Sequence, residues 1–314
     1  ALDSVLRQTL TDIEVICVND GSSDETAAIL DRYAVQDSRI KVIHRGNEGV
    51  SAARNAGIES ASGRYVAFLD ADDELEPEVY EKMFAKAEEG GCDLVQCGHC
   101  EIKDGKVFRT STPAEKCTAT DVKAVPEIVS AQTKYVWDKL FRREMLIKYG
   151  IRFAPLGYHE DHLFLFDVDL VAKKCDAVQY VGYRYSKTSA GAATRSYDER
   201  LLDCTKAYDL ICSKARKAGM FKALAPYIWK NCSQSYAWRV NAFSNYDNEA
   251  LQERIVSNWK VFFDANFPRW QKNMHLAGMP VVLPKGGSLK VLLLGGTGAL
   301  GAHLRDILAD AGYQ

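Results

Sequence analysis

Apolar and polar residues alternate along the first hundred positions in a way that predicts strands and helices in turn. Short apolar runs end at turn residues or at acidic residues, as buried strands do. Between these runs, capping signals and an Ala-rich stretch indicate helices. Strands that alternate with helices at this spacing form βαβ units in a mostly parallel sheet. The strands are predicted at residues 12–20, 40–44, 64–69 and 93–97, and the helices at residues 24–34, 50–58 and 77–89.

The later part of the chain is dominated by helical patterns. A further helix is predicted to open within residues 157–162, and a strand over residues 177–185 follows it. Small and polar residues at 189–196 indicate a loop. From about Leu201 to Phe267 the chain is rich in aromatic residues at helical spacing, which is typical of a helical core. These patterns predict three parts, namely a domain at 1–196, a helical region at 197–280 and a last segment at 281–314.

Acidic residues gather where one predicted strand ends. The strand at residues 64–69 is followed by Asp70, Asp72 and Asp73. Crowded carboxylates repel one another unless a cation joins them, and oxygen ligands suit Mg²⁺ or Mn²⁺. Asp20 also ends a strand, and right-handed crossovers place the ends of successive parallel strands at one edge, where ligands bind. The sequence therefore predicts a metal and diphosphate site, with a solvated acidic turn before the next helix as the alternative.

Composition narrows the class of protein. The 314 residues carry 40 basic and 42 acidic side chains, a net charge of -2 that predicts no nucleic-acid partner. Nine cysteines without metal-type spacing predict free thiols in a reducing compartment. The sequence shows neither a signal-peptide pattern nor an apolar run as long as a membrane span. We therefore expect a cytoplasmic protein with at most peripheral contact at the inner face of the membrane.

Five separated motifs together resemble those of the family 2 glycosyltransferases, which have the GT-A fold. The motifs are Val18-Asn19-Asp20-Gly21-Ser22-Ser23-Asp24, Asn47-Glu48-Gly49-Val50-Ser51-Ala52-Ala53-Arg54-Asn55, Phe68-Leu69-Asp70-Ala71-Asp72-Asp73, Trp137-Asp138-Lys139-Leu140-Phe141, and Glu160-Asp161 followed by Phe164. The resemblance runs from residue 1 to about Ser196 and implies an α/β fold with a doubly wound, mostly parallel sheet flanked by helices. The family's first strand has no counterpart here, so we expect a domain that lacks it.

The resemblance implies a role for each matching residue on the donor side. It implies that Asp20 contacts the uracil ring and that Arg54 lies near the nucleotide. Lys139 in the fourth motif is a further candidate for binding the nucleotide sugar, with a purely structural role as an equal alternative. It further implies that Asp70 and Asp72 form an Asp-x-Asp motif that holds Mn²⁺ or Mg²⁺. Asp73 is expected beside them as a further metal ligand. Such a cation neutralises the leaving diphosphate of a UDP-sugar.

On the acceptor side, the resemblance implies that Asp161 is the general base, with Glu160 beside it. A base near the acceptor hydroxyl, opposite the leaving group, gives inversion at the sugar carbon. Like-charge repulsion from Glu160 would raise the pKa of Asp161, which suits a base. The expected enzyme transfers a sugar from a UDP-sugar donor to a glycan or lipid-linked acceptor, in the synthesis of a cell-surface polysaccharide.

Other interpretations remain open for these residues. Asp20 could be a turn residue, Arg54 a charge on a helix surface, and the pair Glu160-Asp161 two acids at a helix N-terminus. The whole domain could be a catalytically weak UDP-sugar-binding module or a nucleotidyltransferase that makes UDP-sugars. Release of UDP from a UDP-sugar, or of pyrophosphate from UTP, separates these classes.

The last segment carries a second resemblance. The apolar run at residues 289–294 leads into Gly295-Gly296-Thr297-Gly298-Ala299-Leu300-Gly301, and a helix is predicted to about Ala311. This strand, glycine-rich turn and helix resemble the start of a Rossmann domain of the NAD-dependent epimerase and short-chain reductase group. The sequence ends before the acidic residue that binds the ribose in such domains. We therefore expect an incomplete Rossmann unit and no NAD bound by this chain.

Overall fold

The computed structural model describes residues 1–113, 122–187, 197–243 and 247–276. Contacts within the chain define two compact units, Ala1–Cys232 and Ser233–Gln314, and the division falls within helix α9 (Phe221–Asn241). Within the described residues after 196, the predicted helical region is present as a 3₁₀ helix and four α-helices. The Rossmann-like strand and helix predicted over residues 289–311 lie outside the described residues.

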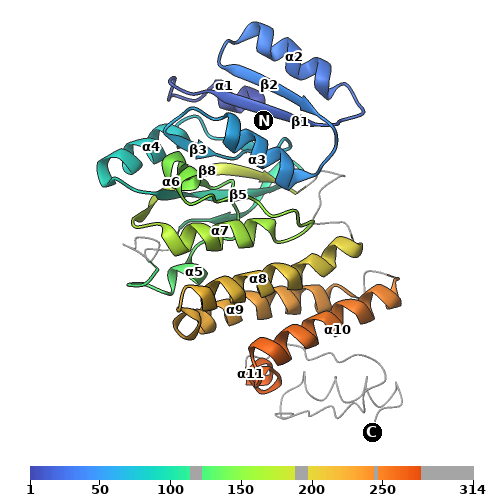
Figure 1. The fold of residues 1–314 in the computed structure, drawn as a ribbon. Coiled ribbons are helices and arrows are strands. Elements are labelled where there is room, and N and C mark those ends of the chain that lie inside the picture. The colour runs from blue at the N-terminus through green and yellow to red at the C-terminus, as the bar shows by residue number, and fades with distance from the viewer. Residues whose placement is uncertain (114–121, 188–196, 244–246, 277–314) are drawn as a thin grey trace. The chain divides into compact units, whose positions relative to one another are not determined.

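The first unit begins with a small parallel sheet. Strands β1 and β2 pair in parallel from Val15 opposite Ile40 to Asp20 opposite Arg45, and α2 connects them, as the alternating pattern predicts (Figure 1). Helix α3 packs on β1 and leads to the next strand. The elements are α1 (Leu2–Leu6), β1 (Val15–Asp20), α2 (Thr26–Gln36), β2 (Ile40–Arg45) and α3 (Val50–Ser60).

A second sheet of six strands forms the centre of this unit. Its order is β3-β7-β5-β8-β4, with β6 paired to β5. In this described sheet β5 and β8 pair in parallel, whereas the other pairs are antiparallel. The α/β class is therefore confirmed, and the pairing is mixed rather than mostly parallel. The strands are β3 (Tyr65–Ala67), β4 (Glu74–Leu75), β5 (Leu94–Lys103), β6 (Lys106–Ser111), β7 (Lys139–Arg142) and β8 (Cys175–Ser186).

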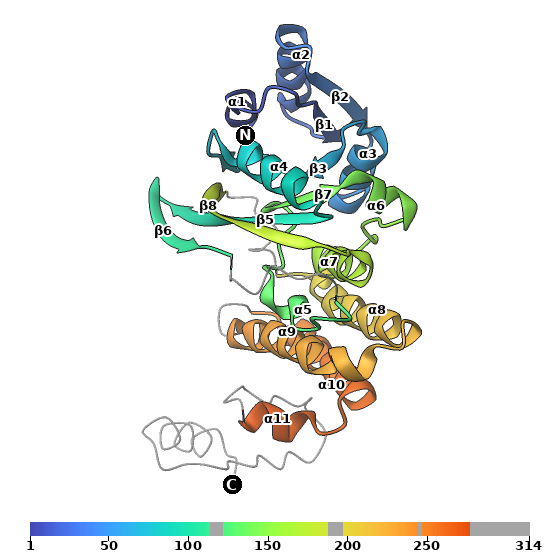
Figure 2. The same ribbon diagram turned by 90° about the vertical axis from the view of Figure 1, so that its left-hand side faces the viewer.

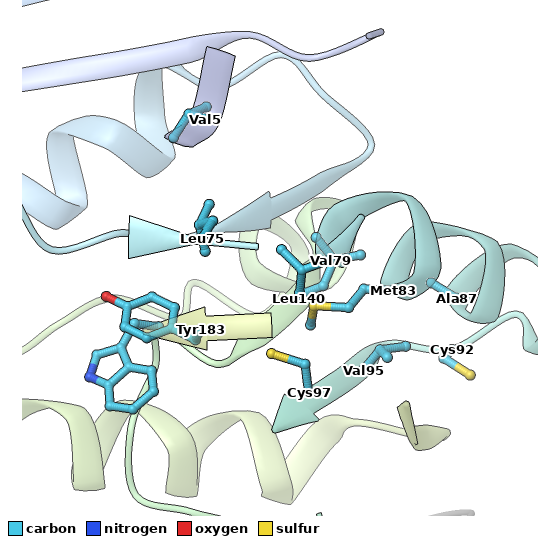
Figure 3. Close-up of a cluster of buried hydrophobic side chains, with 11 residues drawn as sticks. Val5, Leu75, Val79, Met83, Ala87, Cys92, Val95, Cys97, Leu140 and Tyr183 are labelled. Atoms are coloured by element: carbon cyan, nitrogen blue, oxygen red, sulfur yellow. The ribbon is translucent and has the colours of Figure 1, made fainter. Parts of the chain in front are cut away.

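One face of the six-stranded sheet is covered by α4 (Val79–Gly90) (Figures 1 and 2). Every fourth residue of α4 is buried, at Val79, Met83 and Ala87, which is the stripe of an amphipathic helix. These side chains meet Val95 of β5 and Tyr183 of β8 in one apolar cluster (Figure 3). Burial of this stripe holds β8 and the loop before α4 in a defined position.

The opposite face carries α7 (Glu160–Val171) (Figure 2). Phe164 of α7 stacks on Phe153 with ring centroids 4.0 Å apart, and it meets Phe68 and Phe141 edge-on at 6.0 and 5.5 Å. Aromatic pairs in these geometries stabilise beyond the area they bury. The cluster therefore anchors the first turn of α7, which carries the predicted general base, close to the end of β3.

Helix α8 packs along α7 within the same unit, and Lys214 of α8 pairs with Asp167 of α7 at 2.7 Å. In the second unit, Tyr236 and Trp259 pack edge-on with ring centroids 5.8 Å apart. The aromatic-rich stretch after Leu201 is thus a helical core, as predicted. The remaining helices are α5 (Ile128–Ala131), α6 (Arg143–Lys148), η3 (Glu199–Leu202), α8 (Asp203–Lys217), α10 (Glu249–Asn266) and α11 (Trp270–Leu276).

Two expectations from composition can be compared with the described residues. None of the described helices combines the length and the apolar character needed to cross a bilayer. The eight cysteines within the described ranges all carry free thiols, as their irregular spacing predicts.

Candidate functional site

The acidic loop after β3 is held in place by β8. The backbone N–H of Asp70 donates to the Tyr183 hydroxyl at 3.2 Å, and that hydroxyl donates to Asp73 Oδ2 at 2.6 Å. The backbone N–H of Ser186 donates to Asp73 Oδ1 at 2.7 Å. Asp73 is fully buried, and its burial raises its pKa to about 7 despite these hydrogen bonds. Asp73 therefore ties the loop to the sheet, whereas the sequence predicted a metal ligand.

The other two acids of the loop remain accessible to a ligand. Asp72 is exposed, and the Asp70 side chain is 34% exposed, with Oδ1 bonded to Arg54. Within the described residues, no three His, Cys, Asp or Glu side chains are grouped so as to hold a metal by themselves. This donor set fits a hard cation bound by one or two carboxylates together with substrate phosphates, which is how Mg²⁺ usually binds.

Arg54 connects the loop after β3 to the start of α7. Its Nη2 donates to Asp70 Oδ1 at 3.1 Å and its Nη1 to Glu160 Oε1 at 2.9 Å. The side chain is 14% exposed, and its guanidinium lies 5.3 Å from the centre of the Phe153 ring. Burial by itself would lower the pKa of Arg54, but the charges of Asp70 and Glu160 raise it overall. Two acids that lie far apart in the sequence are thus joined by one cation.

The position of Arg54 depends on the loop that begins α3. Asp20 accepts hydrogen bonds from the backbone N–H groups of Glu48 at 3.1 Å and Gly49 at 2.7 Å. Gly49 is the N-cap of α3 with φ of 90°, a conformation that favours glycine. Asp20 therefore fixes the start of the helix that carries Arg54 in its second turn. The contact of Asp20 with uracil stays a prediction.

Asp161 lies in the first turn of α7, close to the Arg54 guanidinium. Burial and the neighbouring charge of Glu160 raise the pKa of Asp161 to about 8, and Arg54 opposes that rise. The backbone N–H of His162 donates to Asp161 Oδ1 at 2.8 Å. The structure thus brings together Arg54, Asp70, Glu160 and Asp161, which the sequence predicted as separate site residues.

Lys139 is not among the side chains that surround Arg54. Its side chain is fully buried, and Nζ donates to Asp138 Oδ1 at 2.7 Å and to the Thr133 hydroxyl at 2.7 Å. Burial alone would raise the pKa of Asp138, but the Lys139 ammonium and three hydrogen bonds lower it overall. Trp137 stacks on Tyr183 with ring centroids 4.1 Å apart. The motif at residues 137–141 therefore contributes a buried ion pair and part of the apolar core. The sequence-based prediction was that Lys139 contacts the nucleotide sugar.

Tyr183 and His162 belong to the site but were not among the predicted site residues. Tyr183 bonds both ends of the acidic loop, and His162 contacts Asp161. Tyr183 and Tyr185 share one face of the predicted strand at 177–185, yet no local pattern shows that this face is buried or which loop Tyr183 meets. His162 could have been recognised as a site residue from the sequence, because it directly follows Glu160-Asp161.

Comparisons with known proteins show which proteins this chain is similar to. Residues 1–150 match the family described as "Glycosyl transferase family 2". The uncharacterised glycosyltransferase EpsJ of Bacillus subtilis is 39% identical over 172 residues, which are 52% of this chain and 49% of EpsJ. The glycosyltransferase GlyG of Streptococcus pneumoniae is 25% identical over 84% of this chain and 91% of GlyG. The chain thus spans about half the length of EpsJ.

Solved structures show the same fold. Residues 1–349 of S. aureus TarS in complex with UDP-GlcNAc superpose with a TM-score of 0.72 at 23% identity. The superposition covers 86% of this chain and 78% of the TarS chain. The GT-A expectation for the fold is confirmed by this likeness.

Proposed function

We propose that the protein, whose residues 1–150 match the family described as "Glycosyl transferase family 2", transfers a sugar from a UDP-sugar to an acceptor hydroxyl with inversion. The observation that carries the proposal is the cluster of Arg54, Asp70, Glu160 and Asp161. In this cluster the Arg54 guanidinium, which would bind the donor phosphates, lies beside the Asp161 carboxylate, whose pKa is raised. The UDP-GlcNAc complex of TarS, which has the same fold, supports a UDP-sugar as donor. We propose a glycan or lipid-linked acceptor in polysaccharide synthesis.

In the proposed reaction Asp161 accepts the proton of the acceptor hydroxyl. The freed oxygen forms a bond to the anomeric carbon on the face opposite UDP, and the bond from that carbon to the phosphate oxygen breaks, so UDP leaves with the electron pair. Arg54, held by Asp70 and Glu160, orients the diphosphate and balances its charge. A divalent cation held by Asp72 and Asp70 would supply further neutralisation of the leaving group.

UDP release is the first test of the proposal. We expect UDP to form when the protein is incubated with Mn²⁺, an oligosaccharide acceptor and UDP-GlcNAc, UDP-glucose or UDP-galactose. Pyrophosphate from UTP and a sugar 1-phosphate would instead indicate a nucleotidyltransferase. UDP bound without either product would indicate a binding module.

The metal part of the proposal predicts a cation-dependent affinity. We expect Mn²⁺ to tighten UDP binding on the order of ten-fold, about 1.4 kcal/mol, because the cation joins Asp72 and Asp70 to the diphosphate. Isothermal titration of UDP with Mn²⁺ and with EDTA measures this difference. Asp72→Asn should reduce it, while Glu59→Gln on α3, outside the cluster, should leave it intact. Equal affinity in Mn²⁺ and EDTA would rule out the metal–diphosphate role.

The two roles of Asp20 predict separate effects. Asp20→Ala removes two backbone hydrogen bonds to a charged acceptor, so we expect the free energy of unfolding to fall by about 2 kcal/mol. If Asp20 also contacts uracil, the affinity for UDP should fall more than the affinity for pyrophosphate. Thermal unfolding and titration of both ligands measure the two effects. An equal loss for both ligands would assign Asp20 to the loop alone.

A further inference from the structure

His162 is held in a defined orientation between α7 and α8. Its Nδ1 lies 2.9 Å from the hydroxyl oxygen of Tyr208, and its Nε2 lies 4.0 Å from Asp161 Oδ1. The imidazole stacks on the ring of His159 with centroids 4.1 Å apart and planes 11° apart. The Tyr208 ring meets it edge-on at 5.8 Å. Both the plane of the imidazole and the direction of its two nitrogens are therefore set by neighbours.

Tyr208 comes from the middle of α8 and is 1% exposed. Burial raises the pKa of Tyr208 well above its usual value, so the hydroxyl keeps its proton at neutral pH. A cavity of about 10 Å³ lies against His162 and Tyr208, with Asp169 and Asn231 among its lining residues. Such a space has room for about one water with polar partners. The His162–Tyr208 pair thus joins a buried hydroxyl to a partly buried imidazole, and a buried polar group is costly unless it is hydrogen-bonded.

We propose that Tyr208 and His162 are positioning residues for Asp161. The Tyr208 hydroxyl donates to Nδ1 of His162, which places the ring hydrogen on Nε2, facing Asp161 Oδ1. The backbone N–H of His162 donates to the same oxygen at 2.8 Å. Asp161 Oδ1 thus accepts from this backbone N–H and has ring Nε2 at 4.0 Å, which leaves Oδ2 as the oxygen that takes the acceptor proton. Contacts of this kind are often long without substrate and shorten in the reacting complex. This inference rests on the proposed role of Asp161 as general base.

The tautomer of His162 is measured without any assay of activity. In protein with ¹⁵N-labelled histidine, the imidazole nitrogen spectrum of the wild type should show His162 with hydrogen on Nε2, and the signal is assigned by its loss in His162→Gln. Tyr208→Phe keeps the ring but removes the hydroxyl, and it should change this signal. Tyr236→Phe is the matched control, because Tyr236 is equally buried but lies on α9 against Trp259. A wild-type His162 with hydrogen on Nδ1 would overturn the proposal.

Turnover gives the second readout. We expect Tyr208→Phe to lower kcat for UDP release about ten-fold, a part of the hundred- to ten-thousand-fold that a general base contributes, with the donor KM unchanged. His162→Gln should lower kcat at least as much. If Asp161→Asn abolishes turnover while both of these variants keep the wild-type kcat, the positioning role is excluded and the proposed function stands. If Asp161→Asn keeps its turnover, the base assignment fails, and the positioning role fails with it.

Discussion

Asp161→Asn is expected to reduce turnover by about a hundred- to ten-thousand-fold, the usual contribution of a general base. Asn keeps the size of the side chain and can still accept from the His162 backbone N–H, but it cannot take a proton. The affinity for the UDP-sugar should stay within a few-fold, because Asp161 acts on the acceptor. UDP release with an acceptor measures the rate, and titration with UDP measures the affinity.

Two further variants on α7 serve as comparisons. Asp167→Asn lies on the same helix and breaks an ion pair with Lys214, so it reports loss of stability without loss of a base. Glu160→Gln removes the acid that pairs with Arg54 and should weaken donor binding as well as rate. Near-normal turnover in Asp161→Asn together with a collapse in Glu160→Gln would move the base role to Glu160.

The raised pKa of Asp161 predicts how the rate depends on pH. Burial and the charge of Glu160 raise this pKa to about 8, so below that pH most of the carboxyl groups carry a proton and cannot act as base. In the free protein kcat/KM should therefore rise with pH and level off above about pH 8. The Asp161→Asn variant should lack this rise. A wild-type profile that is flat between about pH 6 and 9 would contradict the assignment.

Arg54→Ala is expected to lower both stability and donor affinity. The substitution leaves Asp70 and Glu160 without their shared cation, and breaking a largely buried ion pair costs about 3 kcal/mol. The lost contact to the diphosphate, a charged hydrogen bond worth about 1.5–3 kcal/mol, should weaken UDP binding roughly ten- to hundred-fold. Thermal unfolding and titration with UDP measure the two effects.

Arg54→Lys tests whether charge alone is sufficient. Lysine keeps the positive charge but lacks the planar fork that reaches two carboxylates at once, so it should recover only part of the stability and affinity. The control is Arg64→Ala, because Arg64 forms an exposed pair with Glu88 that should contribute less than about 1 kcal/mol. Wild-type UDP affinity in Arg54→Ala would show that Arg54 has a structural role only.

The local pattern of the sequence was sufficient to find the elements that carry the site. Strand β1 ending at Asp20, the short strand before Asp70 and the helix beginning at Glu160 all lie where the apolar periodicity and the motifs placed them. These features depend on neighbouring residues, since strand and helix periods and caps are properties of a few consecutive positions. The same motifs also identified Arg54 and the three acidic side chains that meet around it.

The tertiary structure decided which of the predicted residues face the site. Asp73 and Lys139 are residues of the types expected at such a site, yet both are buried, and Asp73 is bonded to Tyr183, 110 residues away in the sequence. His162 likewise meets Tyr208 across 46 residues. The order and direction of the strands in the six-stranded sheet are also set by such distant pairings. A local pattern can show which side chains share one face of a strand or helix. Only the packing of separate elements determines which partner a buried polar side chain meets. The physical reason is that an unpaired buried polar group is costly, so packing favours arrangements in which buried polar groups are hydrogen-bonded.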